Sequence, residues 1–169
     1  MSGCNAQEEH LCRCSNLLPQ LEVAEVQGYY PLYSRRPGVD VPDVSVLAHN
    51  SVTFFRHPAR YDILPRNEWF KLGVLTAAAE KVRGPRQLGP NAERFIGFLI
   101  QSAVLQQCTH VVLSAWGCGA FGQCPYAVAQ CFRRALARFA PAELSVYFAI
   151  LDDHNSDGNL AAFRQVFSC

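Results

Sequence analysis

The stretch Thr109–Pro125, THVVLSAWGCGAFGQCP, runs from an apolar segment through a glycine-rich loop to a proline. Thr109–Trp116 has the nearly continuous apolar composition of a strand that is buried on both faces. Pro125 suits the first turn of a helix, because its missing N–H needs no partner there. We therefore expect a strand, a loop and a helix in succession, as in a layered α/β domain.

The same alternation of apolar strands and amphipathic helices extends to both sides of this stretch. Asn91 opens a helix whose apolar residues recur at helical spacing as far as Leu105. Their order predicts an α/β fold, and the absence of a linker predicts one domain over residues 1–169. The other expected elements are a strand at Lys71–Ala78, a helix at Tyr126–Phe139, a strand at Leu144–Leu151 and a helix at Asn159–Phe167.

Residues 16–68 have a different texture. They are rich in Pro, Tyr, Arg and turn residues, and their helical periodicity is poor. We expect short strands and loops there, including strands at Val44–Leu47 and Ser51–Phe55.

Composition excludes several classes of protein. The 169 residues carry 15 Lys+Arg and 14 Asp+Glu, a formal net charge of +1. So small a charge does not hold nucleic acid or an anionic membrane by general attraction, and any bound phosphate must be held by local geometry. There is no apolar run near the roughly 20 residues of a membrane span and no signal-peptide pattern at the start. We therefore expect an intracellular protein, cytoplasmic or nuclear, without a membrane or direct nucleic-acid partner.

Eight cysteines are many for such a compartment, and we interpret them as reduced thiols. A zinc site from Cys4, Cys12 and Cys14 is one alternative, but the spacings lack the paired C-x2-C knuckles of structural zinc. We expect no metal and no cofactor. A second alternative is a nucleophilic thiolate at Cys118 or Cys124, close to a helix start, although no histidine stands near either as a partner base.

The first candidate site is the loop Gly117–Gly122. Three glycines in six residues, between a strand and a helix, let backbone N–H groups converge on a diphosphate. The alternative is a tight turn that needs its glycines only for conformation. Phe121 can stack on a sugar or base, or anchor the loop as a buried ring. Trp116 ends the strand and is expected in the core.

The second candidate site is the segment Asn5–Ser15. Asn5 and Glu8 form a capping-box-like helix start, which gives Glu8 a structural role. Glu9 is not explained by that box, and a solvated acid is the plain interpretation. His10 is expected to be an exposed or hydrogen-bonded helix histidine.

Together the two segments resemble the microbial-type poly(ADP-ribose) glycohydrolase catalytic domain, a member of the macrodomain-like superfamily. The specific motifs are AQEExLCRxS at residues 6–15 and AWGCGAFG at residues 115–122. The resemblance covers nearly the whole chain. Supporting segments are VTFFR at 52–56, VLTAAA at 74–79 and FAI at 148–150.

The resemblance implies a macrodomain-like three-layer α/β/α fold with a mixed sheet and an ADP-ribose cleft. Glu9 matches the catalytic general acid/base, and Glu8 matches the residue that helps to hold the ribose diol. Phe121 would pack against the ribose whose glycosidic bond is cut. The expected ligands are ADP-ribose, poly(ADP-ribose) or ADP-ribosylated proteins, and the expected ADP-ribose-binding residues are Gln7, Gly117, Cys118, Gly119, Ala120, Phe121 and Gly122.

The chain departs from the family at its start. The family has a strand, an asparagine and a triple glycine ahead of Q-E-E, whereas six residues precede Gln7 and only Gly3 matches a glycine of that segment. Two alternatives therefore stay open: a truncated or degenerate macrodomain that binds ADP-ribose without turnover, and a non-catalytic interaction domain based on the Pro/Tyr/Arg-rich stretch 28–38. Polymer and mono-ADP-ribose substrates, and exo and endo cleavage, stay open too. Asp152, Asp153 and Asn155 are candidates for the adenine pocket by position alone.

Overall fold

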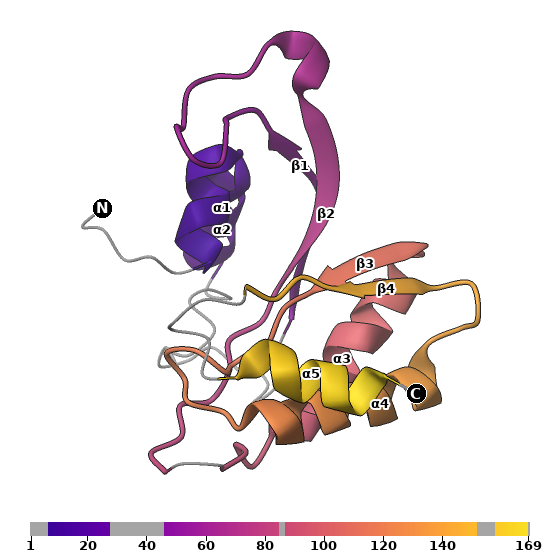
Figure 1. Cartoon of the computed structure of the whole chain (residues 1–169). Coiled ribbons are helices and arrows are strands. Elements are labelled where there is room, and N and C mark those ends of the chain that lie inside the picture. The colour runs from indigo at the N-terminus through magenta and orange to yellow at the C-terminus, as the bar shows by residue number, and fades with distance from the viewer. Residues whose placement is uncertain (1–6, 28–45, 85–86, 152–157, 169) are drawn as a thin grey trace. The chain divides into compact units, whose positions relative to one another are not determined.

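A computed structural model describes residues 7–27, 46–84, 87–151 and 158–168 of the chain (Figure 1). They fall into two compact units, which we describe separately: unit 1 covers residues 1–43 and 47–76, and unit 2 covers residues 44–46 and 77–169. The described strands form one antiparallel pair in unit 1 and one parallel pair in unit 2, so the predicted mixed α/β fold is confirmed. No helix of the described ranges is long and apolar enough to cross a membrane.

Unit 1 places two helices beside a two-stranded antiparallel ribbon (Figure 1). Phe54 pairs with Phe70 and Leu47 pairs with Thr76, with a register shift between His49 and Val52. The single strand Leu47–Phe54 contains most of the expected strand Ser51–Phe55 and begins at the last residue of the expected strand Val44–Leu47. Val44 and Ser45 of the expected strand lie outside the described residues. The elements are α1 (Gln7–Cys14), α2 (Leu17–Val26), β1 (Leu47–Phe54), the 3-10 helix η1 (Arg66–Glu68) and β2 (Phe70–Thr76).

Helix α2 contradicts the expectation of short strands and loops for residues 16–68. Leu17, Leu21 and Ala24 are buried at the i, i+4, i+7 spacing of one helix face. Pro19 is the third helical residue, where the missing N–H has no intrahelical partner to lose. The proline therefore marks the first turn of a helix rather than a loop.

The core of unit 1 joins these helices to the ribbon. Leu17 and Val52 are fully buried, and Leu21, Phe54 and Cys14 are almost so. Burying a Leu, Val or Phe side chain contributes about 1.5–3 kcal/mol each. This packing holds the end of α1 against β1, and so positions the acidic residues at its start.

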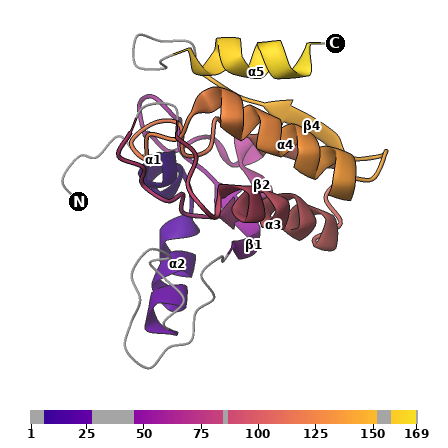
Figure 2. The same cartoon turned by 90° about the horizontal axis from the view of Figure 1, so that it is seen from below.

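Unit 2 repeats the predicted alternation of helices and strands. α4 lies between α3 and α5, in a row of helices on one side of the parallel pair β3–β4 (Figures 1 and 2). The expected positions are confirmed, with shorter strands. The elements are α3 (Ala92–Leu105), β3 (His110–Leu113), α4 (Pro125–Phe139), β4 (Ser145–Phe148) and α5 (Asn159–Phe167).

Within unit 2 the strands are buried on one face rather than on both. Phe148 packs against Phe132 and Phe163, with ring centroids 5.4 and 5.0 Å away. The alternate residues Val112 and Tyr147 are 70% and 55% exposed. The expectation of burial on both faces is therefore wrong within this unit, because the helices of unit 2 cover one side of the pair.

Candidate functional site

Helix α1 carries the predicted acidic pair in its first turn. Glu8 and Glu9 are both half-buried, whereas Gln7 is exposed. Carboxylates near a helix N-terminus interact favourably with its dipole, by about 0.3–1 kcal/mol each. Asn5, the other half of the expected capping box, lies outside the described residues.

The C-terminal end of α1 is tied to the end of β1. With eight residues, α1 is too short to be stable alone, so tertiary contacts must hold it. Cys14 O accepts hydrogen bonds from Phe55 N at 3.0 Å and Arg56 N at 3.2 Å. Ser15 Oγ donates to Leu11 O at 2.7 Å and accepts from Leu17 N at 3.1 Å, which fixes the turn into α2. α1 is thereby a rigid support for its acidic residues.

Glu9 lies in an ion pair on one side of α1. Its Oε2 atom is 3.4 Å from the guanidinium of Arg13, one helical turn later, and both side chains are about one-third exposed. Arg13 lies over the ring of Tyr61, 5.9 Å from its centroid, and the Tyr61 hydroxyl is 3.1 Å from His10 Nδ1. Tyr61 has φ of +60°, a strained value for a bulky residue. His10 has the hydrogen-bonded helix role expected for it.

Glu8 acts electrostatically on Cys12 and His49. Burial, with the Glu8 and Glu9 carboxylates, raises the pKa of Cys12 to about 11. Burial lowers the pKa of His49, and the Glu8 carboxylate opposes that change. Glu9 thus contacts the Arg13 guanidinium, both glutamates act on the Cys12 thiol, and Glu8 also acts on the His49 imidazole.

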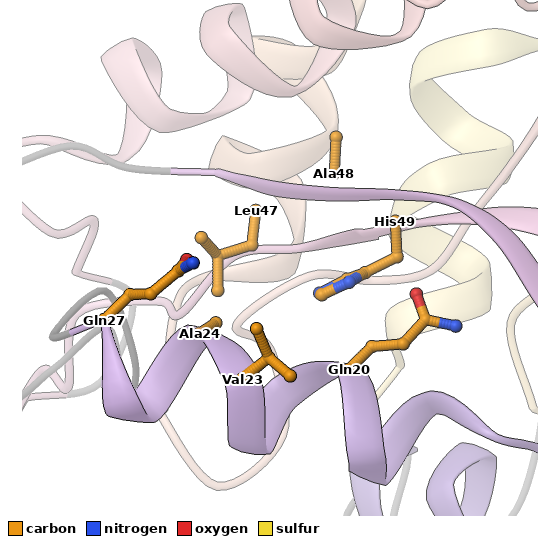
Figure 3. Close-up of a pocket in the computed structure, with 7 residues that line it drawn as sticks. All are labelled: Gln20, Val23, Ala24, Gln27, Leu47, Ala48 and His49. Carbon is orange, nitrogen blue, oxygen red and sulfur yellow. The ribbon is translucent and has the colours of Figure 1, made fainter.

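His49 also lines a pocket of about 360 Å³ between α2 and β1 (Figure 3). Its ring points into the pocket, and its buried Nε2 atom has no hydrogen-bond partner among the residues that the structure describes. Val23, Ala24 and Leu47 make the apolar part of the lining. The pocket belongs entirely to unit 1.

The predicted glycine loop follows β3 in unit 2, and its shape requires two of its glycines. Gly117 and Gly122 have φ of +76° and +69°, which side chains rarely adopt. A Cβ at Gly117 would also lie 2.7 Å from Gln123 Cγ and 2.9 Å from Ala79 Cβ. Gly119 has open space around it. The turn interpretation of the glycines is thus correct for Gly117 and Gly122.

Between those two glycines the loop presents a run of backbone donors. Gly119, Ala120 and Phe121 are exposed, and within the described ranges their N–H groups donate no hydrogen bond. The flanking amides are occupied, because Cys118 N donates to Ala115 O and Gly122 N donates to Gly119 O. Three successive free N–H groups in a glycine-rich turn are a potential anion-binding surface.

Phe121 stands on the exposed side of this loop. Its side chain is 37% exposed, so the alternative of a buried anchor is wrong. Its carbonyl accepts a hydrogen bond from Val82 N at 2.9 Å, which fixes the backbone while leaving the ring accessible. The ring is available to stack on a ligand.

Sequence reasoning missed Gln123, which directly follows the loop. Gln123 is 2% exposed; its Oε1 accepts from Gly89 N at 2.7 Å and its Nε2 donates to Glu80 O at 2.6 Å. The Glu80 carboxylate in turn accepts from the backbone N and the Nδ2 of Asn91, at the start of α3. No periodic or motif signal marks a single glutamine at a loop end, so only the structure reveals it.

The nucleophile alternative is wrong for Cys118. Burial raises the pKa of its thiol to about 12, with a smaller effect from Cys124, and Sγ donates to Trp116 O at 3.6 Å. A neutral buried thiol is inert. Trp116 packs against Phe95 and donates from Nε1 to Ala77 O at 3.0 Å, which agrees with its expected core role.

The described residues hold no group of three or more metal-ligating side chains. Cys4, the first member of the alternative zinc site, lies outside the described ranges, as do Asp152, Asp153, Asn155 and the stretch 28–38. The acidic pair lies in unit 1, and the Gly117–Gly122 loop lies in unit 2.

No protein-family model and no curated protein matches the chain. Several solved structures are similar to it. The poly(ADP-ribose) glycohydrolase of Deinococcus radiodurans in complex with ADP-ribose matches with a TM-score of 0.72 and 27% identity, over 99% of this chain and 69% of that chain. Its apo form matches with a TM-score of 0.64 and 26% identity, over 94% and 67%.

The enzyme of Thermomonospora curvata bound to the inhibitor ADP-HPD matches with a TM-score of 0.60 and 25% identity, over 98% of this chain and 64% of that chain. The predicted resemblance to bacterial poly(ADP-ribose) glycohydrolases is therefore confirmed. The chain has their macrodomain-like α/β fold.

Proposed function

We propose that this protein binds ADP-ribose and hydrolyses the ribose glycosidic bonds of poly(ADP-ribose) or of ADP-ribosylated protein. The observation that carries the proposal is the run of free N–H groups at Gly119, Ala120 and Phe121, in a chain whose structural relatives include a complex with ADP-ribose. Backbone donors suit a diphosphate because they supply directed partial charges without a net positive field. The net charge of +1 agrees with recognition by geometry.

Phe121 and the acidic pair supply the remaining parts of the proposed site. The motif resemblance implies that the accessible Phe121 ring packs on the ribose next to the diphosphate and that Gln7 is a further ADP-ribose-binding residue. Glu8 accepts hydrogen bonds from the ribose diol. These roles come from the motif resemblance, and the exposure of Phe121 and the rigid support of α1 agree with them.

Glu9 is the proposed general acid and base. Its protonated carboxyl gives a proton to the oxygen of the leaving ribose as the C1–O bond breaks, and the diphosphate stabilises the oxocarbenium-like centre. The resulting carboxylate takes a proton from water while the water oxygen bonds to C1, which regenerates the acid. Arg13 holds the carboxylate in place between the two steps through the contact at 3.4 Å.

The proposal includes a site of action in the cytosol or nucleus. Among the residues that the structure describes, six cysteines are free thiols, which is typical of proteins in a reducing compartment. They are Cys12, Cys14, Cys108, Cys118, Cys124 and Cys131.

A second candidate function is ADP-ribose binding without turnover. The Glu9–Arg13 ion pair favours it, because it engages Glu9 Oε2 with the Arg13 guanidinium at 3.4 Å, whereas catalysis needs that carboxyl group to contact the oxygen of the leaving ribose. The free amides of the loop serve either function equally.

The test measures ADP-ribose release from poly(ADP-ribose) and from an ADP-ribosylated protein, with calorimetric binding of ADP-ribose in parallel. We expect turnover by the wild type and a rate of ADP-ribose release that is about 100-fold or more lower in Glu9→Gln. The affinity of Glu9→Gln for ADP-ribose should stay within a few-fold of that of the wild type. Glu22→Gln, an exposed glutamate on α2, is the matched control. Binding without turnover supports the second candidate, and an absence of both overturns the proposal.

A further inference from the structure

We infer that Gln123 is a positioning residue, which clamps the loop Gly117–Gly122 in the shape that keeps its free N–H groups turned toward one anion. The inference rests on the proposed function, because it concerns the same ADP-ribose site. Gln123 is buried and therefore does not touch the ligand itself. It acts through the loop that precedes it.

Both ends of the Gln123 side-chain amide are used. Oε1 accepts from Gly89 N at 2.7 Å, and Nε2 donates to Glu80 O at 2.6 Å. Its own backbone N donates to Gly117 O at 2.9 Å, across the base of the loop. Gln123 therefore joins the first glycine of the loop to Glu80 and Gly89, neither of which lies in a motif of the resemblance to glycohydrolases.

The backbone at Gly89 and at Gly117 lies close to the Gln123 side chain. A Cβ on Gly89 would lie 2.8 Å from Gln123 Nε2 and 2.7 Å from Glu80 Oε2, and a Cβ on Gly117 would lie 2.7 Å from Gln123 Cγ. Gly89 and Gly117 thus let the backbone approach the amide from two sides. A buried amide with so close a fit fixes its partners in one arrangement.

Glu80 extends the clamp to the start of α3. Its carbonyl holds Gln123, and its carboxylate accepts from the N and Nδ2 atoms of Asn91, at 2.8 and 2.9 Å. Helix α3 is anchored by buried Ile96 and Ile100, so the loop is tied to the core of unit 2. Without the clamp, the loop that carries residues 119–121 loses this tie to the core, and we expect that its N–H groups are no longer held toward one anion.

Gln123→Met and Gln123→Glu test the inference in the full chain. Met keeps the approximate volume but makes neither hydrogen bond. Leaving a buried hydrogen bond unmade changes an equilibrium constant roughly 10- to 100-fold. We therefore expect ADP-ribose to bind Gln123→Met about tenfold or more weakly than it binds the wild type. In turnover assays KM should rise by that factor while kcat changes little, because the clamp does not touch the acid in α1.

Gln123→Glu tests the inference through the pH dependence of ADP-ribose affinity, which a purely structural role of Gln123 would not change. A protonated carboxyl can donate to Glu80 O as the amide does, whereas a carboxylate would set two oxygens against each other. Affinity should therefore approach that of wild type at about pH 5 and fall toward that of Gln123→Met at about pH 8. Wild type measured at both values corrects for any effect of pH on the ligand.

Val166→Ala is the matched control for stability, since Val166 is buried in α5 and is remote from the loop in sequence. It should lower the melting temperature and leave the Kd of the folded fraction unchanged. If wild type binds ADP-ribose and both Gln123 variants bind equally well at every pH, the inference is wrong. If wild type itself does not bind, the proposed function fails; hydrogen exchange of the Cys118 and Gly122 amides, which are hydrogen-bonded within the loop, then decides the clamp, which is supported only if Gln123→Met speeds exchange there and not in α5.

Discussion

Helix α1 of unit 1 and the Gly117–Gly122 loop of unit 2 differ in the kind of chemistry that each presents. Helix α1 presents ionisable side chains: Glu9 lies 3.4 Å from Arg13, and Glu8 acts on the pKa values of Cys12 and His49. The loop presents N–H groups that carry no titratable charge. Charge substitutions should therefore matter in the helix, and changes of backbone conformation in the loop.

Gly117→Ala should have the largest effect, because it attacks the loop through its backbone. The φ of +76° and the contacts of 2.7 and 2.9 Å that a Cβ would make combine two costs, and we expect a loss of about 2–4 kcal/mol of stability with no measurable ADP-ribose binding. Thermal denaturation and calorimetry measure both. Gly119→Ala, where a Cβ meets nothing within 4 Å, is the control and should retain most of the stability. Equal stability losses in the two variants would contradict the described loop conformation.

Phe121→Ala should have an intermediate effect that is confined to binding. The ring is 37% exposed, so its removal should change stability by less than about 1 kcal/mol. Loss of stacking on a sugar or base should weaken ADP-ribose binding by roughly tenfold. Titration calorimetry with Phe121→Ala, and with Phe121→Tyr as a control that keeps an aromatic ring, checks this. Unchanged affinity in Phe121→Ala would remove the ring from the site.

His49 should give the smallest effect, and one that belongs to unit 1 alone. Because burial lowers its pKa in the folded state, the unfolded chain takes up the proton more readily. The resulting stability is fully present above the ordinary histidine pKa of about 6.5 and is lost as the pH falls below it. His49→Gln should therefore reduce the loss of stability between about pH 7.5 and pH 5, by at most about 1 kcal/mol.

Thermal melts at the two pH values measure this difference. His110→Gln, an exposed histidine of β3, is the control and should leave the pH dependence of wild type in place. If His49→Gln and wild type lose the same stability on acidification, then His49 is not the group responsible.

The elements of unit 2 were predictable, because their signal is local. Amphipathic helices and apolar strands alternate from residue 71 onward, and Asn91 and Pro125 mark helix starts within one residue of those observed. Helix α2 was not predicted. Its buried face consists of only Leu17, Leu21 and Ala24. The proline and turn-residue content of residues 16–68 indicated loops, whereas Pro19 lies in the first turn of a helix.

The candidate site was predictable only in part. The motif residues identify Glu8, Glu9 and the loop as candidates, since unusual residue types in a short span stand out in a sequence. The ion pair of Glu9 follows from its i, i+4 spacing to Arg13. Cys12 likewise lies one helical turn after Glu8, whereas His49 comes near Glu8 only when β1 packs against the helices.

The order of residues alone established an α/β chain with a glycine loop between a strand and a helix, because hydrophobic periodicity and glycine placement act over a few residues. Long-range contacts established the rest. They expose the ring of Phe121 and bury Gln123 between Glu80 and Gly89. Glu80 and Gly89 lie 43 and 34 residues from Gln123 along the chain, and no local rule connects positions so far apart.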